Sequence, residues 1–152
     1  MRYVIGIGNY YGLDDSIGLK VAEAIGEEGL DVGFRAIDLG GNLIDVLHYL
    51  DADTETVLIV DSARMGLAPG EFAFFTPDQV RSDKALAGFS SHEGDLLKVL
   101  ELGSALGTPL ARITILGIQP EDVRAEPGLS ETLSARFREY VDAAVRFVTT
   151  AS

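Results

Sequence analysis

The chain has 152 residues, with 12 Lys and Arg against 24 Asp and Glu, so its formal net charge is −12. Hydrophobic residues at 47% and charged residues at 24% are an ordinary globular composition, and the length favours a single domain over residues 1–152. The absence of cysteine excludes disulfides, cysteine-ligated metal sites and cysteine nucleophiles. The acidic charge argues against nucleic acid and anionic membrane surfaces as partners.

The sequence contains no apolar run that approaches the ~18 residues expected of a membrane-spanning helix. The first apolar stretch, Tyr3–Ile7, is short and runs directly into a glycine turn, which is unlike the apolar core of a signal peptide. We therefore expect a cytoplasmic protein.

The first part of the chain alternates between strand-like and helix-like periodicity. Three apolar segments predict strands buried in a sheet: Tyr3–Ile7, Val32–Leu39 and Thr56–Val60. A helical stripe over Ile17–Ile25 follows the first strand, and Asp14 or Asp15 can cap this helix. A second stripe over Leu43–Leu50 predicts a helix between the other two strands.

The second part of the chain begins with a strand of different direction. Pro69–Gly70 predicts a turn, and the strand Phe72–Phe75 follows too closely for a helical crossover, so we expect it to run antiparallel to its neighbours. Three elements complete the chain: a helix whose capping box pairs Ser90 with Glu93, a buried strand over Ile113–Ile118, and a last helix capped by Ser130.

The order of these elements predicts the fold class. Strands that alternate with helices indicate an α/β protein, a three-layer α/β/α single domain on a mostly parallel, five-stranded mixed sheet with one antiparallel strand. Ligands of such sheets bind at the carboxyl ends of the strands, so functional residues are sought there.

Three residues are expected at this edge of the sheet. Asp15 follows the first strand, Asp61 follows the third, and His92 lies in the first turn of the helix capped by Ser90. Each has a structural explanation by itself, as a helix cap, a turn cap or a buried histidine. Together, two carboxylates and one imidazole form a donor set suited to zinc, nickel or a similar divalent ion. The same trio could instead serve in acid–base catalysis without a metal.

Weaker candidates surround this trio. Asp38 ends the second strand and could line the same crevice, and Gly8 and Asn9 form the turn after the first strand. This turn starts like a dinucleotide-binding loop, but Tyr11 stands where the third glycine of the motif belongs. His48 borders the apolar stripe of the second helix, and we interpret it as a surface residue.

Four segments give the sequence a resemblance to a known family. In chain order they are GIGNYYGLDDSIG, LIVDSA followed by Pro69–Gly70, SSHEGDLL, and ILGIQPE followed by GLS. This pattern resembles the hydrogenase maturation endopeptidases, which trim the C-terminal extension from the large subunit of nickel–iron hydrogenases. The four segments span nearly the whole chain, and the resemblance also implies a mixed sheet with one antiparallel strand.

The resemblance implies a site, a metal and a partner. The acidic metal-binding positions of the family fall on Asp15 and Asp61, its histidine falls on His92, and a further acidic position falls on Asp38. The implied partner is a hydrogenase large-subunit precursor that brings its own nickel, and other divalent ions such as cadmium or zinc could occupy the same site. Ser16 stands where the family often has glycine, which is a departure from the pattern.

Other functions stay open at this point. A non-catalytic α/β module could bind a nucleotide or another anion through the Gly8–Asn9 loop and the following helix start. A chaperone could bind the large subunit and check for nickel without cleaving it. A metallopeptidase of broad specificity is weakened by the absence of the H-E-x-x-H motif.

Overall fold

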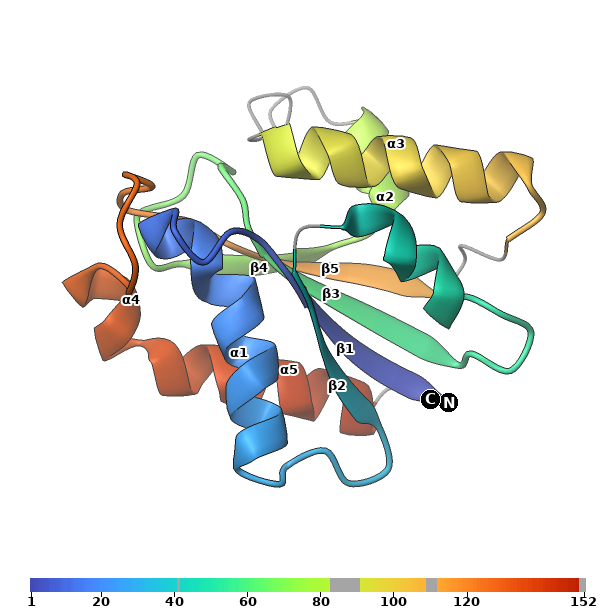
Figure 1. Cartoon of the computed structure of the whole chain (residues 1–152), viewed down its shortest axis with the longest axis horizontal. Coiled ribbons are helices and arrows are strands. Elements are labelled where there is room, and N and C mark those ends of the chain that lie inside the picture. Colours follow the sequence, from blue (N-terminus) through green and yellow to red (C-terminus); the bar gives the residue numbers. More distant parts are fainter. Residues whose placement is uncertain (41, 83–90, 109–111, 151–152) are drawn as a thin grey trace.

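The computed structural model describes residues 1–40, 42–82, 91–108 and 112–150, with the side chains of residues 80–82 and 91–95 outside the described part. The chain forms three layers, with a central sheet between two layers of helices (Figure 1). No helix in the described ranges is long and apolar enough to cross a membrane.

The central sheet has five strands: β1 (Arg2–Ile7), β2 (Arg35–Gly40), β3 (Thr56–Ser62), β4 (Phe72–Phe75) and β5 (Ile113–Ile118). Their spatial order is β2-β1-β3-β5-β4. All neighbouring strands are parallel except β4 and β5, which are antiparallel. The predicted α/β fold with a five-stranded mixed sheet and one antiparallel strand is therefore confirmed.

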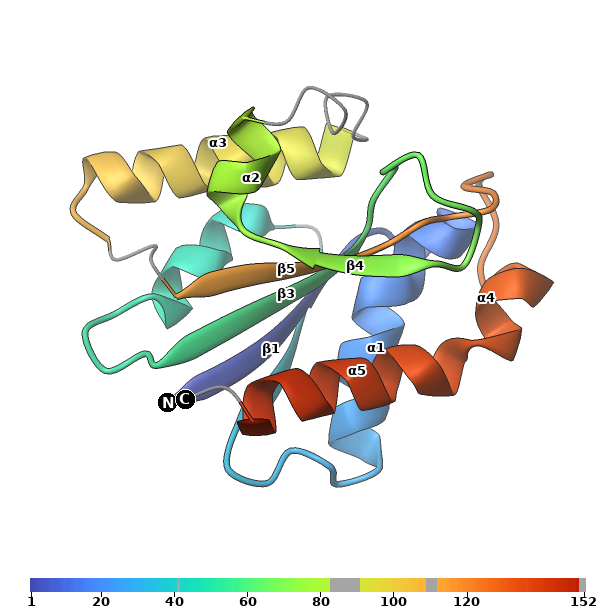
Figure 2. The same cartoon turned by 180° about the vertical axis from the view of Figure 1, so that it is seen from behind.

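The helical elements are η1 (Leu13–Ser16), α1 (Ile17–Glu27), η2 (Leu43–Tyr49), α2 (Pro77–Ser82), α3 (Ser91–Ala105), α4 (Glu131–Ala135) and α5 (Phe137–Thr150), where η denotes a 3₁₀ helix. Helices α1 and α5 cross each other on one face of the sheet, whereas α2 and α3 lie on the other (Figures 1 and 2). Two apolar clusters, one on each face, form the core.

Side-chain alternation along β3 divides its residues between these two clusters. Leu58 and Val60 pack with α1 and α5, whereas Val57 and Ile59 pack with η2 and α3. The buried Leu96 of α3 belongs to the second cluster, as its helical spacing predicts. Each face of the sheet is thus apolar, which explains why β3 reads as a continuous apolar run.

Two predicted elements of the first half have different bounds. The second strand begins at Arg35 instead of Val32, because Gly33 adopts a φ of +83° and Val32 is 79% exposed. Asp14 and Asp15 do not cap α1 but lie inside the 3₁₀ turn η1 that precedes it. The periodicity of the sequence predicts the apolar face of α1 but does not predict this additional turn.

Three other predictions need smaller corrections. The second predicted helix is the 3₁₀ helix η2, which ends at Tyr49. Asp61 lies within β3, because pairing with β5 continues to Ser62. The last predicted helix is divided at Arg136 into α4 and α5, with Ser130 capping α4 by accepting a hydrogen bond from the Leu133 amide. Ser90, the other predicted cap, lies outside the described residues.

Two glycines allow α1 to approach the sheet closely. A Cβ atom on Gly18 would lie 2.1 Å from the Val60 carbonyl oxygen and 2.5 Å from that of Ile7. A Cβ atom on Gly6 would lie 2.1 Å from the Gly18 carbonyl oxygen. The start of α1 therefore rests directly on the backbones of β1 and β3, and no larger residue fits at either position.

We expect Gly18→Ala to destabilise the fold by more than about 3 kcal/mol, because the new methyl group meets rigid backbone rather than a flexible side chain. Gly26→Ala is the matched control within the same helix, since a Cβ atom there meets nothing within 4 Å. This control should stabilise the protein by about 0.5–1 kcal/mol through helix propensity. Urea unfolding measures the free energy of unfolding of both variants. Small and equal changes in the two variants would contradict the close approach of α1 to the sheet.

Candidate functional site

The carboxyl ends of the parallel strands meet at one side of the molecule. Strands β1 and β3 run toward the side where α1 begins, and α3 also begins there (Figures 1 and 2). The segment 119–130 that follows β5 lies at the same side. The starts of α1 and α3 and the segment 119–130 thus lie at the strand ends, as expected for the binding edge of an α/β sheet.

The turn after β1 fixes the backbone of Asp15. Gly8 has a φ of +143°, and a Cβ atom on it would lie 2.1 Å from the Asp15 carbonyl oxygen. The same oxygen accepts a hydrogen bond of 3.1 Å from the Asn9 amide, and the Asp15 amide donates to the Gly12 carbonyl at 2.9 Å. Gly8 and Asn9, predicted to line the crevice, therefore hold Asp15 in place.

This turn is not arranged as a phosphate-binding loop. A phosphate cradle presents backbone N–H groups to its ligand. Six amides of this turn donate to the protein itself: those of Asn9, Tyr11, Gly12, Leu13, Asp14 and Asp15. The nucleotide- or anion-binding alternative therefore loses its physical basis at this loop.

Ser62 connects the two acidic residues that the sequence singled out. Its hydroxyl donates a hydrogen bond of 2.5 Å to Oδ1 of Asp15. Its amide donates a hydrogen bond of 2.8 Å to Oδ1 of Asp61. Asp61 and Ser62 are buried, whereas Asp15 is half-buried. Both Asp15 and Asp61 are therefore hydrogen-bonded to Ser62 at the end of β3.

The two carboxylates reach the end of β3 from different layers. Asp61 has the same parity along the strand as Val57 and Ile59, so it falls on the face that packs against η2 and α3. Ser62 falls on the opposite face, together with Val60, and meets Asp15 there. The pair therefore lies where the two helical layers meet the strand end.

The third member of the predicted trio is only partly placed. His92 lies in the first turn of α3, on the layer that Asp61 faces, but its side chain is outside the described residues. Within the described ranges, no three His, Cys, Asp or Glu side chains form a group that could hold a metal ion. The assignment of His92 to a metal site therefore stays a prediction.

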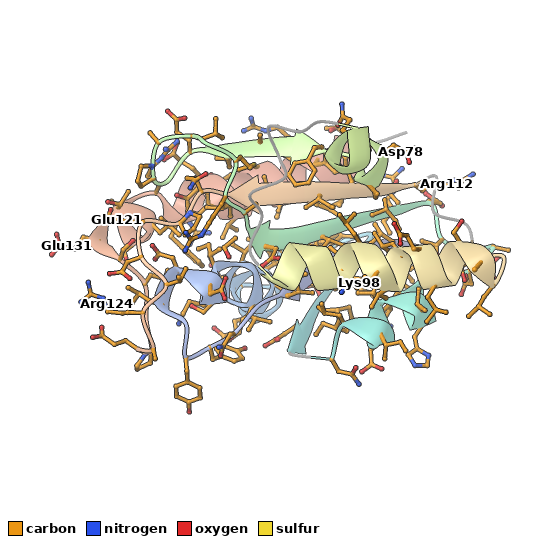
Figure 3. All side chains as sticks on the ribbon, turned by 90° about the horizontal axis from the view of Figure 1, so that it is seen from above. Asp78, Lys98, Arg112, Glu121, Arg124 and Glu131 are labelled. Atoms are coloured by element: carbon orange, nitrogen blue, oxygen red, sulfur yellow. The ribbon has the colours of Figure 1, made fainter. Side chains whose placement is uncertain are left out.

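Asp14, the neighbour of Asp15, has a different role. Its buried carboxylate accepts three backbone hydrogen bonds, from the amides of Glu121 at 2.9 Å, Asp122 at 3.1 Å and Ser130 at 2.8 Å. Its own amide donates to the Asp122 carbonyl. Asp14 therefore fastens segment 119–130 to η1, and Figure 3 shows Glu121 and Glu131 at this end of the molecule.

Asp38 belongs to a separate group at the outer strand β2. The Tyr10 hydroxyl is hydrogen-bonded both to Asp38 and, at 2.8 Å, to Glu23 of α1. Burial, followed by these two carboxylates, raises the pKa of the Tyr10 hydroxyl, which keeps it protonated. Asp38 is exposed, and its predicted place in the crevice stays a prediction.

Two residues of this region were missed by sequence reasoning. Ser62 was not among the predicted site residues, and Asp14 was considered only as a helix cap. The side-by-side carboxylates in the first motif and the hydroxyl directly after Asp61 were the available signals. His48, in contrast, is confirmed as a surface residue: it is 79% exposed, and its Nε2 lies 3.6 Å from Asp45.

We expect Asp14→Asn to destabilise the fold by about 3 kcal/mol or more, because an amide NH₂ would face backbone donors where a carboxylate oxygen now accepts. The control is Asp142→Asn, an exposed aspartate of α5, which should change stability by less than about 0.5 kcal/mol. Chemical denaturation compares the two variants. If the Asp14→Asn protein were as stable as the control, the hydrogen bonds of Asp14 to segment 119–130 would not stabilise the fold as we expect.

Comparison with known proteins identifies similar sequences over most of the chain. The hydrogenase maturation protease family model matches residues 19–147. The hydrogenase expression/formation protein HoxM of Azotobacter vinelandii is 25% identical over 147 residues, which cover 95% of this chain and 70% of that protein. The hydrogenase 2 maturation protease of Escherichia coli K12 is 28% identical over 154 residues, covering 94% of this chain and 89% of that protein.

The solved structures agree on the fold. A [NiFe] hydrogenase maturation protease, HybD from Thermococcus kodakarensis, superposes with a TM-score of 0.77 at 22% identity. The alignment covers 97% of this chain and 98% of that protein. At this level of identity the likeness concerns the arrangement of helices and strands.

Proposed function

Since this chain belongs to the hydrogenase maturation protease family, a family of peptidases, we propose that it removes the C-terminal extension from the large-subunit precursor of a nickel–iron hydrogenase. The observation that supports the proposal is that Asp15 and Asp61 both accept hydrogen bonds from Ser62 at the carboxyl edge of the sheet. Carboxylates at the edge where ligands of an α/β sheet bind can serve as the acid–base groups of peptide hydrolysis. The cytoplasmic location expected from the sequence stays a prediction.

We further propose that the precursor brings nickel to this edge and that Asp15, Asp61 and His92 recognise it there. Carboxylate oxygens and an imidazole nitrogen suit nickel, and the same donors suit cadmium or zinc. Two carboxylates would nearly neutralise a divalent ion, which lowers the cost of burying the fully enclosed Asp61 beside it. A nickel-free precursor would lack the group that these residues bind, so it would not be processed.

The two carboxylates differ in what they can do during hydrolysis. Bound nickel would polarise the scissile carbonyl as a Lewis acid. Asp15 is half-buried and can reach a water molecule, so it accepts the proton when the water oxygen bonds to the carbonyl carbon. That proton goes to the leaving amine when the C–N bond breaks. Asp61 is fully buried and serves to bind and orient.

The first experiment follows the mass of the precursor with and without nickel. We expect the wild-type protein to remove a C-terminal peptide only from the nickel-loaded precursor. Asp15→Asn, Asp61→Asn and His92→Ala should each lower the rate by at least about 100-fold, the usual range for a lost acid–base group. Asp142→Asn, an exposed position on α5, should cleave at the wild-type rate.

Each other outcome points to a different function. An intact precursor that forms a nickel-dependent complex would identify a checking chaperone. Cleavage at equal rates with and without nickel would retain the peptidase and reject nickel recognition. Neither cleavage nor binding would reject a hydrogenase precursor as the substrate.

We expect Ser62→Ala to lower kcat about 10-fold while KM changes by less than twofold. The lost hydroxyl acts through Asp15, whose Oδ1 it restrains, and contacts no substrate in this proposal. Ser62→Thr, which restores a hydroxyl, should recover part of the rate, and steady-state cleavage kinetics measure all three proteins. A rate unchanged in Ser62→Ala would show that Asp15 needs no such restraint.

A further inference from the structure

A groove of about 380 Å³ lies away from the carboxyl edge, between α1 and the start of the α4–α5 pair. Its lining includes Lys20, Glu23, Ala24, Glu27, Leu129 and Phe137. Helices α1 and α5, which both contribute lining residues, cross each other in both views of the fold (Figures 1 and 2). Nothing in the catalytic proposal uses this groove.

The floor of the groove is apolar and continuous with the core. Ala24, Leu129 and Phe137 are half-buried side chains that pack against the apolar cluster under α1 and α5. None of the polar residues along the groove is buried, since Glu23 and Glu27 are exposed and Lys20 is half-exposed. An open groove without enclosed polar groups suits a side chain of a macromolecule better than a small ligand, which needs convergent polar contacts.

The rim of the groove is negatively charged. The charged side chains that line it are two carboxylates, Glu23 and Glu27, and one ammonium group, Lys20. The Tyr10 hydroxyl links Glu23 to Asp38, so the acidic line continues to the carboxyl end of β2. A chain with a net charge of −12 also attracts basic partners over a longer range.

The groove lies apart from the carboxyl edge, where we propose that hydrolysis takes place. Ala24 follows Asp15 by nine residues along η1 and α1, which corresponds to roughly 14 Å at 1.5 Å per residue. A peptide bond held at Asp15 would not fill the groove. A neighbouring part of the same protein substrate could fill it.

We propose that this groove is a docking site for the protein substrate and binds an apolar side chain flanked by Lys or Arg. The apolar side chain covers Ala24, Leu129 and Phe137, and the basic groups face Glu23 and Glu27. This inference rests on the proposed function, because it takes the same precursor as the partner. Docking here strengthens substrate binding without taking part in the chemical step.

The test measures kcat and KM for cleavage of the nickel-loaded precursor by wild type, Ala24→Arg and Ala105→Arg. Ala24→Arg fills the groove and adds a positive charge, so KM should rise about tenfold while kcat stays within twofold. Ala105→Arg makes the same change at an exposed position of α3, in the opposite layer, and should leave both constants unchanged. Arginine is a good helix former, so neither site loses helix propensity to any large extent.

A second variant distinguishes a loss of docking from a folding defect caused by replacing the half-buried Ala24. Glu27→Lys changes only an exposed side chain and should raise KM at least threefold at low salt, with the difference shrinking as salt screens the charges. Unchanged KM in both Ala24→Arg and Glu27→Lys would overturn the docking site. If the wild type leaves the precursor intact, the proposed function fails, and the docking site is judged by precursor binding: equal Kd for wild type and Glu27→Lys overturns it as well.

Discussion

The contact between the start of α1 and the backbones of β1 and β3 determines where the carboxylate of Asp15 lies. Gly6 and Gly18 make this contact possible, since a single methyl group at either position would meet a carbonyl oxygen at 2.1 Å. The turn η1 leads directly into α1, so the depth of the helix start also sets the depth of Asp15. The start of α1 packs on two central strands, so rigid backbone positions the residues that it carries. Such positioning suits functional groups that must stay within fractions of an ångström of their reacting partners.

The adjacent residues Asp14 and Asp15 have opposite surroundings and separate tasks. Asp14 is fully buried and satisfied by three backbone amides, an arrangement that stabilises a carboxylate without a counter-ion. It holds segment 119–130 against η1 and so closes one side of the strand ends. Asp15 turns toward Ser62 and remains half-buried, which leaves it accessible to a substrate.

The sequence predicts best what depends on local pattern. The short connection before Phe72 was enough to predict an antiparallel strand, and the apolar run Thr56–Val60 was enough to predict a buried strand. The role of Asp14 could not be predicted, because its three amide donors lie 107 to 116 residues further along the chain. The late start of β2 and the division of the last helix at Arg136 likewise follow from backbone geometry that periodicity does not encode.

The position of the site between two helical layers bears on how a nickel-loaded substrate could be distinguished. Ser62 and Asp15 belong to the α1 side of β3, whereas Asp61 falls on the side of α3, whose first turn carries His92. In the proposed mechanism, Asp15, Asp61 and His92 would hold the nickel ion that the substrate brings, so the ion would link residues from both layers. In the proposed docking, the groove beside α1 would bind the precursor whether or not nickel is present. Docking and metal recognition are then separate steps: the first would set how tightly the precursor binds, and the second would decide whether it is cut.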